Sequence, residues 1–460
     1  MNNSEVYIGL DIGTTSIKAM VCENVKGQLK VISVGVVPSA GLNRGVIVDI
    51  DKTARAISQA IKQAEEKSNI DIKNVVVGLP ANYLQMQRVH GSITIASQGQ
   101  SREITDRDVI DVAKETLTQS ISPEMAVLDL IPTEFTVDGF DGIKDPRGMV
   151  GVRLEMKGTL YTGPKTIIHN TKKAIQQAGY GICDFVIAPI ATGFTLLNDG
   201  EQDFGTVMID LGGGQTTTSI IHDHQLKYTF VDPEGGQYVT KDISTVLNTS
   251  LRNAEQLKLD HGYAMASLTK ADAQVDVPVV GENAPQQFSE EYLAEIIEAR
   301  VRQIFQRSRQ RLQAIHAPRL PGGVVLVGGG ASMPGIVQLA QQYFKESVSV
   351  YQSDQMGVRY PRYSLALALT MYESQLSDVD RLIKQTLQQT DLISSPHETK
   401  AASQPAQQPR QEQWRNAPAR RETTNHNEQR PVEKKPARAK KNKSHSLGNR
   451  FKSMFNNLFD

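Results

Sequence analysis

The chain contains one short pattern twice, and this repetition constrains the fold more than any other feature of the sequence. The first copy runs from Val6 to Lys18 and the second from Thr206 to Thr217. Each copy is an apolar strand that ends in an aspartate, followed by a turn of glycine and small residues and then a new strand. Because the copies lie far apart, they predict a duplicated half of the molecule and not a short solenoid repeat.

Both turns carry the groups that hold a polyphosphate. Gly13 permits a backbone conformation that other residues avoid, so that the amides after it can converge on one point. Hydroxyl groups and one lysine add donors and a cation, and a nearby aspartate can orient the water shell of Mg²⁺. Alone, each copy could equally be an ordinary strand-turn-strand segment, but the pair predicts a phosphate clamp. Its residues are Asp11, Gly13, Thr14, Thr15, Lys18, Asp210, Gly212, Gly213, Gly214 and Thr216, with Asp11 and Asp210 facing Mg²⁺ through water.

Further glycines extend the predicted site. The apolar run Val324 to Val327 ends at Gly328, Gly329 and Gly330, where the backbone could approach a flat adenosine closely. Gly235 and Gly236 precede a helix whose first amides would be unpaired and suited to phosphate. The two hairpin turns and the glycine turn at 328–330 follow one another along the chain. Together they resemble the motifs of the ATPase superfamily of actin, the heat-shock chaperones and the sugar kinases. Over residues up to about 390, the resemblance implies ATP and Mg²⁺ as ligands and an α/β, duplicated actin-like (ribonuclease H-like) two-lobed fold.

The same resemblance assigns two further positions. It implies that Glu255 and Lys258 reach the ribose and base, although two charges at this spacing on a helix could equally pair in solvent. Several relatives carry a carboxylate, suited to Mg²⁺ or to the attacking water, where this chain has Ala188. A methyl group can do neither, so we expect at most slow ATP hydrolysis and assign no catalytic residue.

A small α+β segment interrupts the first half. It contains alternating strands, a helix that begins at Thr105 with a capping pattern to Asp108, and the run Asp145 to Glu155. An insert at this place resembles the FtsA family of bacterial cell-division proteins, where it is an interaction subdomain; a mere extension of the fold is the alternative. The predicted parts are a first lobe (1–83, 162–195 and about 359–392), the insert (84–161), a second lobe (196–228 and about 302–358), its small subdomain (229–301), a disordered basic linker (393–445) and a terminal helix (446–460).

Composition indicates a soluble globular protein, since 39% of the residues are hydrophobic and 22% are charged. The two cysteines, Cys22 and Cys183, lie in apolar strand-like segments and are expected to be buried thiols in a reducing cytoplasm. The N-terminus lacks a basic and then apolar leader, and no apolar run is long enough to span a bilayer. We therefore expect a cytosolic protein that is attached at most to one face of a membrane.

The C-terminal tail has a different character. From residue 397 on it holds 14 lysines and arginines against 6 acidic residues, which favours an anionic partner. Its last segment places apolar side chains on one face of a helix, and such a short helix should fold only on a partner. An anionic membrane surface is favoured over a hydrophobic protein groove, and a nucleic-acid arm is the weakest alternative. The predicted membrane-facing residues are Leu447, Phe451, Met454, Phe455, Leu458 and Phe459.

The resemblance to the FtsA family implies an adaptor function. Such a protein binds ATP, self-associates into dimers or filaments, ties the tubulin-like protein FtsZ to the cytoplasmic face of the cell membrane at the division septum, and recruits later division proteins. An ATP-driven chaperone or a small-molecule kinase is the enzymatic alternative, and a pilus-assembly actin homologue is the other structural one. The arginines of the long helix predicted from Ser289 share that helix with glutamates and lack aromatic companions. That helix therefore favours a solvated face or a protein contact, and no nucleic-acid partner is expected.

Overall fold

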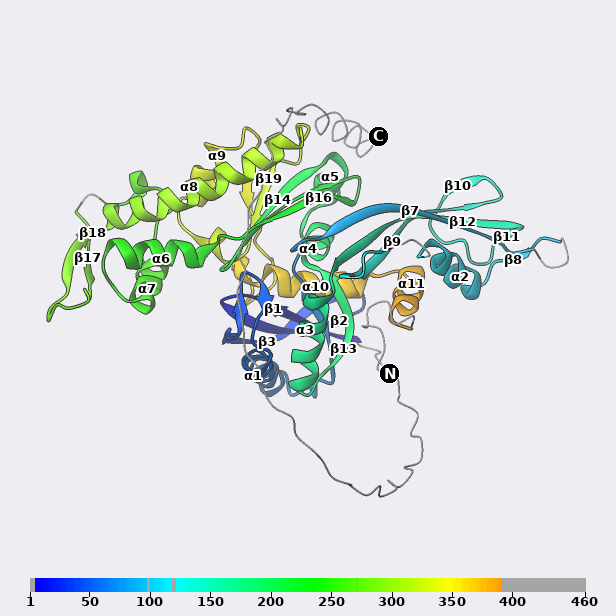
Figure 1. Cartoon of the computed structure of the whole chain (residues 1–460), viewed down its shortest axis with the longest axis horizontal. Coiled ribbons are helices and arrows are strands. Elements are labelled where there is room, and N and C mark those ends of the chain that lie inside the picture. The colour runs from blue at the N-terminus through cyan, green and yellow to red at the C-terminus, as the bar shows by residue number, and fades with distance from the viewer. Residues whose placement is uncertain (1–4, 97–99, 118–120, 271, 390–460) are drawn as a thin grey trace, which may run out of the picture. The chain divides into compact units, whose positions relative to one another are not determined.

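The computed structural model describes residues 5–96, 100–117, 121–270 and 272–389, which include both glycine turns (Figure 1). The predicted linker and the predicted terminal helix, from residue 393 on, lie outside these residues. Within the described part of the chain, no helix combines the length and the apolar character that crossing a bilayer requires.

The first lobe is built on a five-stranded sheet in the order β13-β6-β1-β2-β3. β1 and β2 are the antiparallel strands of the first glycine hairpin; β6 pairs with β1 in parallel, and β13 pairs with β6 in parallel. Apolar side chains of α1 (Ile50–Ser68) cover one face, and those of α10 (Ser364–Gln375) pack on the other. The strands are β1 (Glu5–Ile12), β2 (Ser16–Val25), β3 (Gln28–Pro38), β6 (Asn74–Leu79) and β13 (Gly181–Ile187).

The second lobe repeats this topology. Its sheet has the order β16-β15-β14-β19-β20. β14, β15 and β16 are antiparallel neighbours, β19 pairs with β14 in parallel, and β20 pairs with β19 in parallel. The sequence prediction of a duplicated, mixed α/β, actin-like fold is therefore confirmed. The strands are β14 (Thr206–Leu211), β15 (Thr216–His222), β16 (Gln225–Asp232), β19 (Val324–Val327) and β20 (Val348–Val350).

A smaller helical group extends the second lobe beside β16. The 25-residue helix α8 (Glu290–Ala314) begins at Ser289, as predicted, where the serine side chain accepts a hydrogen bond from the amide of Tyr292. It packs against α6 (Gly236–Val246), which in turn packs against α7 (Leu251–His261). A short hairpin of β17 (Gln274–Val277) and β18 (Gln286–Ser289) completes the group.

The segment between β6 and α3 (Lys165–Gln177) forms a four-stranded antiparallel sheet, β10-β9-β12-β7, with one covering helix, α2 (Asp106–Thr116). The predicted capping box is present, because Thr105 and Asp108 bond each other's backbone amides. Residues Met125 to Val137 form one long strand, and its register opposite β12 is irregular. The main strands are β7 (Gln85–Thr94), β9 (Met125–Val137), β10 (Phe140–Ile143) and β12 (Arg153–Pro164).

The last described helix, α11 (Asp378–Gln389), completes the core of this inserted sheet. Val379, Ile383 and Leu387 are buried in the same apolar cluster as residues of α2 and β9, and α11 lies beside α2 in Figure 1. The sequence grouped residues 359–392 with the first lobe and did not anticipate this packing.

One expectation about the cysteines is wrong. Cys22 is buried, and burial raises the pKa of its thiol to about 11. Cys183 is exposed; it lies where the register of β13 against β6 shifts, between the paired residues Ile182 and Asp184.

Candidate nucleotide site

A cavity of about 730 Å³ lies where the two glycine hairpins meet, which is within the size range of small-molecule sites. Both lobes contribute to its wall, and all but two of the residues predicted from the sequence line it. The predicted residues that do so are Asp11, Gly13, Thr14, Thr15, Lys18, Asp210, Gly212, Gly213, Gly214, Gly236, Glu255, Lys258, Gly328, Gly329 and Gly330.

The two hairpin turns touch each other across the cavity. A Cβ atom at Gly213 would lie 2.4 Å from Thr15 Cγ2, and one at Gly214 would lie 2.5 Å from Thr14 Cγ2. Since such distances do not occur between real side chains, only glycine permits this approach of the lobes. The turns are therefore positioned to contact one ligand from both sides.

Two carboxylates and one cation lie at the base of the turns. Lys18 donates to Asp11 at 2.8 Å, and both side chains are buried. The pKa of Asp210 is raised to about 6, chiefly by burial and also by the charge of Asp11, while Lys18 lowers it in part. Among the described residues, no group of three or more His, Cys, Asp or Glu side chains could hold a metal ion. A Mg²⁺ held here by Asp11 and Asp210 would therefore need phosphate and water oxygens to complete its shell.

The start of α6 differs from the sequence expectation. The amides of Gly236 and Gln237 donate to the carbonyl oxygens of Gly212 and Gly213 at 3.0 and 2.7 Å, so they are already paired. Gly236 lines the cavity, whereas Gly235 and Thr216 do not. Gly235 packs behind the second turn, and the Thr216 hydroxyl donates to the carbonyl oxygen of Glu234 at 2.9 Å. Gly235 therefore serves the close packing of helix and turn.

Glu255 and Lys258 form the ion pair that the sequence allowed, and they do so in the wall of the cavity. They pair with each other at 2.7 Å, and both line the cavity. Lys258 is largely buried and also donates to the Thr240 hydroxyl at 2.8 Å and to the Gly236 carbonyl at 3.1 Å. The pair is thus part of the wall and not a solvated surface pair.

Several cavity residues carry no signal in the sequence. Gly45, Tyr360 and Arg362 reach the wall from segments that the sequence did not connect with the site, and Gln215 and Leu259 reach it from segments that were predicted for the site through other residues. Ala188, at the start of α4 (Ala188–Leu196), also lines the cavity.

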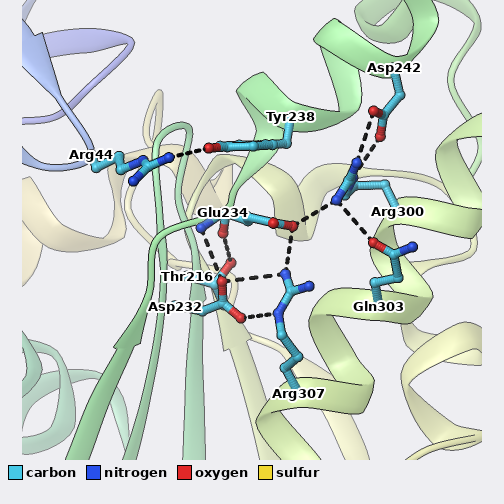
Figure 2. Close-up of polar contacts among 9 residues, drawn as sticks. All are labelled: Arg44, Thr216, Asp232, Glu234, Tyr238, Asp242, Arg300, Gln303 and Arg307. Atoms are coloured by element: carbon cyan, nitrogen blue, oxygen red, sulfur yellow. Dashed lines mark hydrogen bonds and ion pairs between the residues drawn. The ribbon is translucent and has the colours of Figure 1, made fainter. Parts of the chain in front are cut away.

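Two arginines of α8, Arg300 and Arg307, are engaged with acidic residues of the second lobe (Figure 2). Arg307 donates to Asp232 and to Glu234, and Arg300 donates to Glu234 at 2.8 Å and to Asp242 at 2.6 Å. Burial raises the pKa of Glu234, but the two arginines lower it more, so that it lies below the ordinary value. This network fixes the segment that leads into Gly235 and Gly236.

Comparisons with known proteins agree with this architecture. The family model described as "Cell division protein FtsA" matches residues 207–368, and that of the "SHS2 domain inserted in FTSA" matches residues 81–162. The chain is 53% identical to the cell division protein FtsA of Enterococcus faecalis, over 84% of this chain and 87% of that one. It is 40% identical to FtsA of Bacillus subtilis (81% and 84% covered) and 30% identical to FtsA of Escherichia coli (80% and 90%).

The solved structures show the fold alone. The PilM–PilN complex of type IV pilus biogenesis contains a chain that matches with a TM-score of 0.56 at 15% sequence identity. The match covers 80% of this chain and 99% of that one.

Proposed function

Because the chain belongs to the FtsA family of cell division proteins, we propose that it is an ATP-binding adaptor of the division machinery. In this proposal it binds ATP with Mg²⁺ between its lobes and self-associates. It tethers FtsZ to the cytoplasmic face of the cell membrane at the septum and recruits later division proteins.

The contact of two matched turns around one cavity carries the nucleotide part of this proposal. Thr14, Thr15 and the second-turn glycines line the same space as Lys18, so donors and a cation surround one position. Asp11 and Asp210 add the negative charge that a hydrated Mg²⁺ requires. Gly328 to Gly330, Glu255 and Lys258 line the same cavity and are proposed to contact the adenosine.

We also propose that any ATP hydrolysis is slow. Ala188 lines the cavity at the start of α4 but has no group that could accept a proton or orient the attacking water. A positioned general base is worth about 10²–10⁴ in rate, so its absence suits a protein whose nucleotide acts by holding the lobes closed.

The other parts of the proposal rest on the family and on the sequence. The insert, predicted at 84–161, would contact later division proteins, and the small subdomain at 229–301 would contact FtsZ. The terminal helix at 446–460, outside the described residues, would bind the anionic membrane through the linker at 393–445.

A substitution in the second turn tests the nucleotide part. Gly213→Ala would place a methyl group 2.4 Å from Thr15 Cγ2, so the turns could no longer meet, and we expect the affinity for Mg-ATP to fall at least tenfold. Gly200→Ala is the control, because Gly200 has only the Asn198 side chain nearby, at 3.5 Å. Isothermal titration of both variants measures the affinity, and circular dichroism checks the fold. Equal ATP affinity of the two folded variants would refute the clamp.

A further inference from the structure

Arg44 and Tyr238 join the two lobes beside the cavity (Figure 2). Arg44 occupies the turn between the short strands β4 (Leu42–Asn43) and β5 (Val46–Ile47), which belong to the first lobe. Its Nη2 donates to the Tyr238 hydroxyl at 2.5 Å, and its guanidinium carbon lies 5.8 Å from the centre of the Tyr238 ring. Tyr238 belongs to the first turn of α6 in the second lobe, so separation of the lobes must break this contact.

The second lobe holds the Tyr238 ring in place. The guanidinium carbon of Arg300 lies 5.6 Å from the ring centre, so a second arginine contacts the same ring. Arg300 is itself held by Asp242, one turn further along α6, and by Glu234 (Figure 2). The ring is therefore positioned independently of Arg44, and formation of the contact orders little more than the Arg44 side chain.

The residues next to Arg44 and Tyr238 are each hydrogen-bonded to one of the two glycine turns. Next to Arg44, the amide of Gly45 donates to the Thr14 hydroxyl of the first turn at 2.9 Å. Next to Tyr238, the amide of Gln237 donates to the Gly213 carbonyl of the second turn at 2.7 Å. A ligand that fixes both turns therefore also fixes both sides of the Arg44–Tyr238 contact.

A second contact between the lobes lies beside the first. The Asn82 amide, which follows β6 in the first lobe, donates to Gln215 Oε1 of the second turn at 3.1 Å. Gly45 packs on the same Gln215 amide so closely that a Cβ atom there would lie 2.6 Å from it. The β4–β5 turn thus meets the second lobe at two points, Tyr238 and Gln215.

From these contacts we propose that Arg44 and Tyr238 form a latch that slows nucleotide release by holding the lobes together. The latch rests on the proposed function, because it presupposes a nucleotide bound by both turns. If the contact stabilises the closed state, it also strengthens the binding of a ligand that requires this state. By reciprocity, the bound ligand stabilises the contact. Arg44 is exposed and the pairing of an exposed cation with an aromatic ring is weak, so the effect should be a few-fold change in rate.

Stopped-flow displacement of a fluorescent ATP analogue by unlabelled ATP, with Mg²⁺ and the full chain, tests the latch. We expect Arg44→Ala to raise the dissociation rate about three- to tenfold and Tyr238→Phe to raise it about threefold. The double variant should release nucleotide no faster than Arg44→Ala alone, because the two side chains act through one contact. The association rate of the analogue with each variant should stay within twofold of the rate with the unaltered chain. Arg55→Ala, which removes an exposed arginine of α1 outside the cavity wall, should change neither rate.

The outcomes separate the latch from the proposed function. Failure of the unaltered chain to bind the analogue would refute the proposed function, and the latch with it. Normal binding with dissociation rates that Arg44→Ala and Tyr238→Phe leave within twofold would refute the latch alone. A fall in the association rate for Arg44→Ala, with no effect of Tyr238→Phe, would also refute it, since Arg44 would then act only by attracting the phosphates.

Discussion

Asp210 lies at the base of the turns near the Asp11 carboxylate and the Lys18 ammonium group, and this arrangement makes its charge sensitive to pH. Burial raises its pKa to about 6, against about 4 for an aspartate in an unfolded chain. Between pH 4 and pH 6 the folded state binds more protons than the unfolded chain. The contribution of Asp210 to the free energy of unfolding is therefore complete below pH 4 and is lost as the pH rises through 6. The ionised form is less favourable for the empty cleft but is the form that would attract Mg²⁺.

We predict that the stimulation of ATP binding by Mg²⁺ declines below about pH 6. Protonation of Asp210 removes one of the two charges that would face the ion, so the affinity should fall by up to tenfold per pH unit. Titrations of ATP with and without Mg²⁺ between pH 5 and pH 8 measure this. The phosphates of ATP titrate in the same range, so Asp210→Asn serves as the reference and should lack this extra decline. An identical pH profile for both proteins would exclude a role of Asp210 in Mg²⁺ binding.

Gly45 provides a prediction about the approach of the lobes. Its φ is +74°, and a methyl group there would meet the Gln215 amide, so Gly45→Ala should lower the affinity for Mg-ATP about tenfold. The control is Gly27→Ala, at φ +82° with no atom near its Cβ position. Both variants should lose about 1–2 kcal/mol of stability from the left-handed backbone, but only the first should lose affinity. Isothermal titration and chemical denaturation give the two values.

A second substitution separates contact from strain. Shortening Gln215 to alanine in the Gly45→Ala background removes the atoms that the new methyl group would meet, so part of the affinity should return. If Gly45→Ala binds nucleotide as tightly as Gly27→Ala, the close approach of the β4–β5 turn to the second lobe has no importance for binding.

The residues of the cleft show what the sequence could reveal. Asp11, Lys18 and Asp210 were predictable, because each lies at a fixed place in a repeated strand-turn-strand pattern. Gly45 and Gln215 were not, since their contact depends on how two separate lobes meet. The same is true of the paired amides of Gly236 and Gln237, where a local pattern predicted free donors and the neighbouring turn uses them.

At the level of elements, α11 joins the insert to the first lobe. Lys384 of α11 lies 3.0 Å from Asp129 of β9 and 2.8 Å from Asp184 of β13, and all three side chains are buried. Burial lowers the pKa of Lys384, but the two carboxylates raise it more, so the ammonium group stays charged. One cation thus bridges three elements that are distant in the sequence.

We predict that Lys384→Met destabilises the protein by about 3–5 kcal/mol, because it leaves two buried carboxylates without their cation. Chemical denaturation measures the loss, and Lys114→Met, at an exposed position on α2, is the control. Adding Asp129→Asn and Asp184→Asn to Lys384→Met should restore much of the stability, since no uncompensated charge then remains. A Lys384→Met variant as stable as the control would show that the bridge contributes nothing.

The sequence predicted where helices and strands form better than it predicted which elements pack against each other. Thr105 and Asp108 revealed the start of α2, because a capping box is a local pattern. The apolar stripe Val379, Ile383 and Leu387 is equally regular, but a stripe does not say which surface covers it. That this apolar stripe packs on the insert, while Lys384 of the same helix pairs with Asp184 of the first lobe, is a property of the folded chain.

At the level of the whole molecule, the proposed adaptor requires a cleft that senses nucleotide and a segment that binds the membrane. The cleft lies within the described residues, and its two lobes repeat one topology. The predicted membrane segment follows a basic linker, so its binding should depend on its own apolar face and on the charges beside it. The two functions should therefore be separable by substitution.

The terminal segment gives the clearest test of this separation. We predict that Phe451→Glu with Phe455→Glu abolishes sedimentation with anionic liposomes and leaves ATP affinity unchanged. Burial of two phenylalanines is worth about 3–6 kcal/mol, so their loss should weaken membrane binding at least a hundredfold. Asn456→Glu with Asn457→Glu makes the same charge change away from the predicted apolar face and should weaken binding much less. Equal losses in the two variants would mean that charge alone attracts the tail, and continued sedimentation of the first variant would place membrane binding elsewhere in the chain.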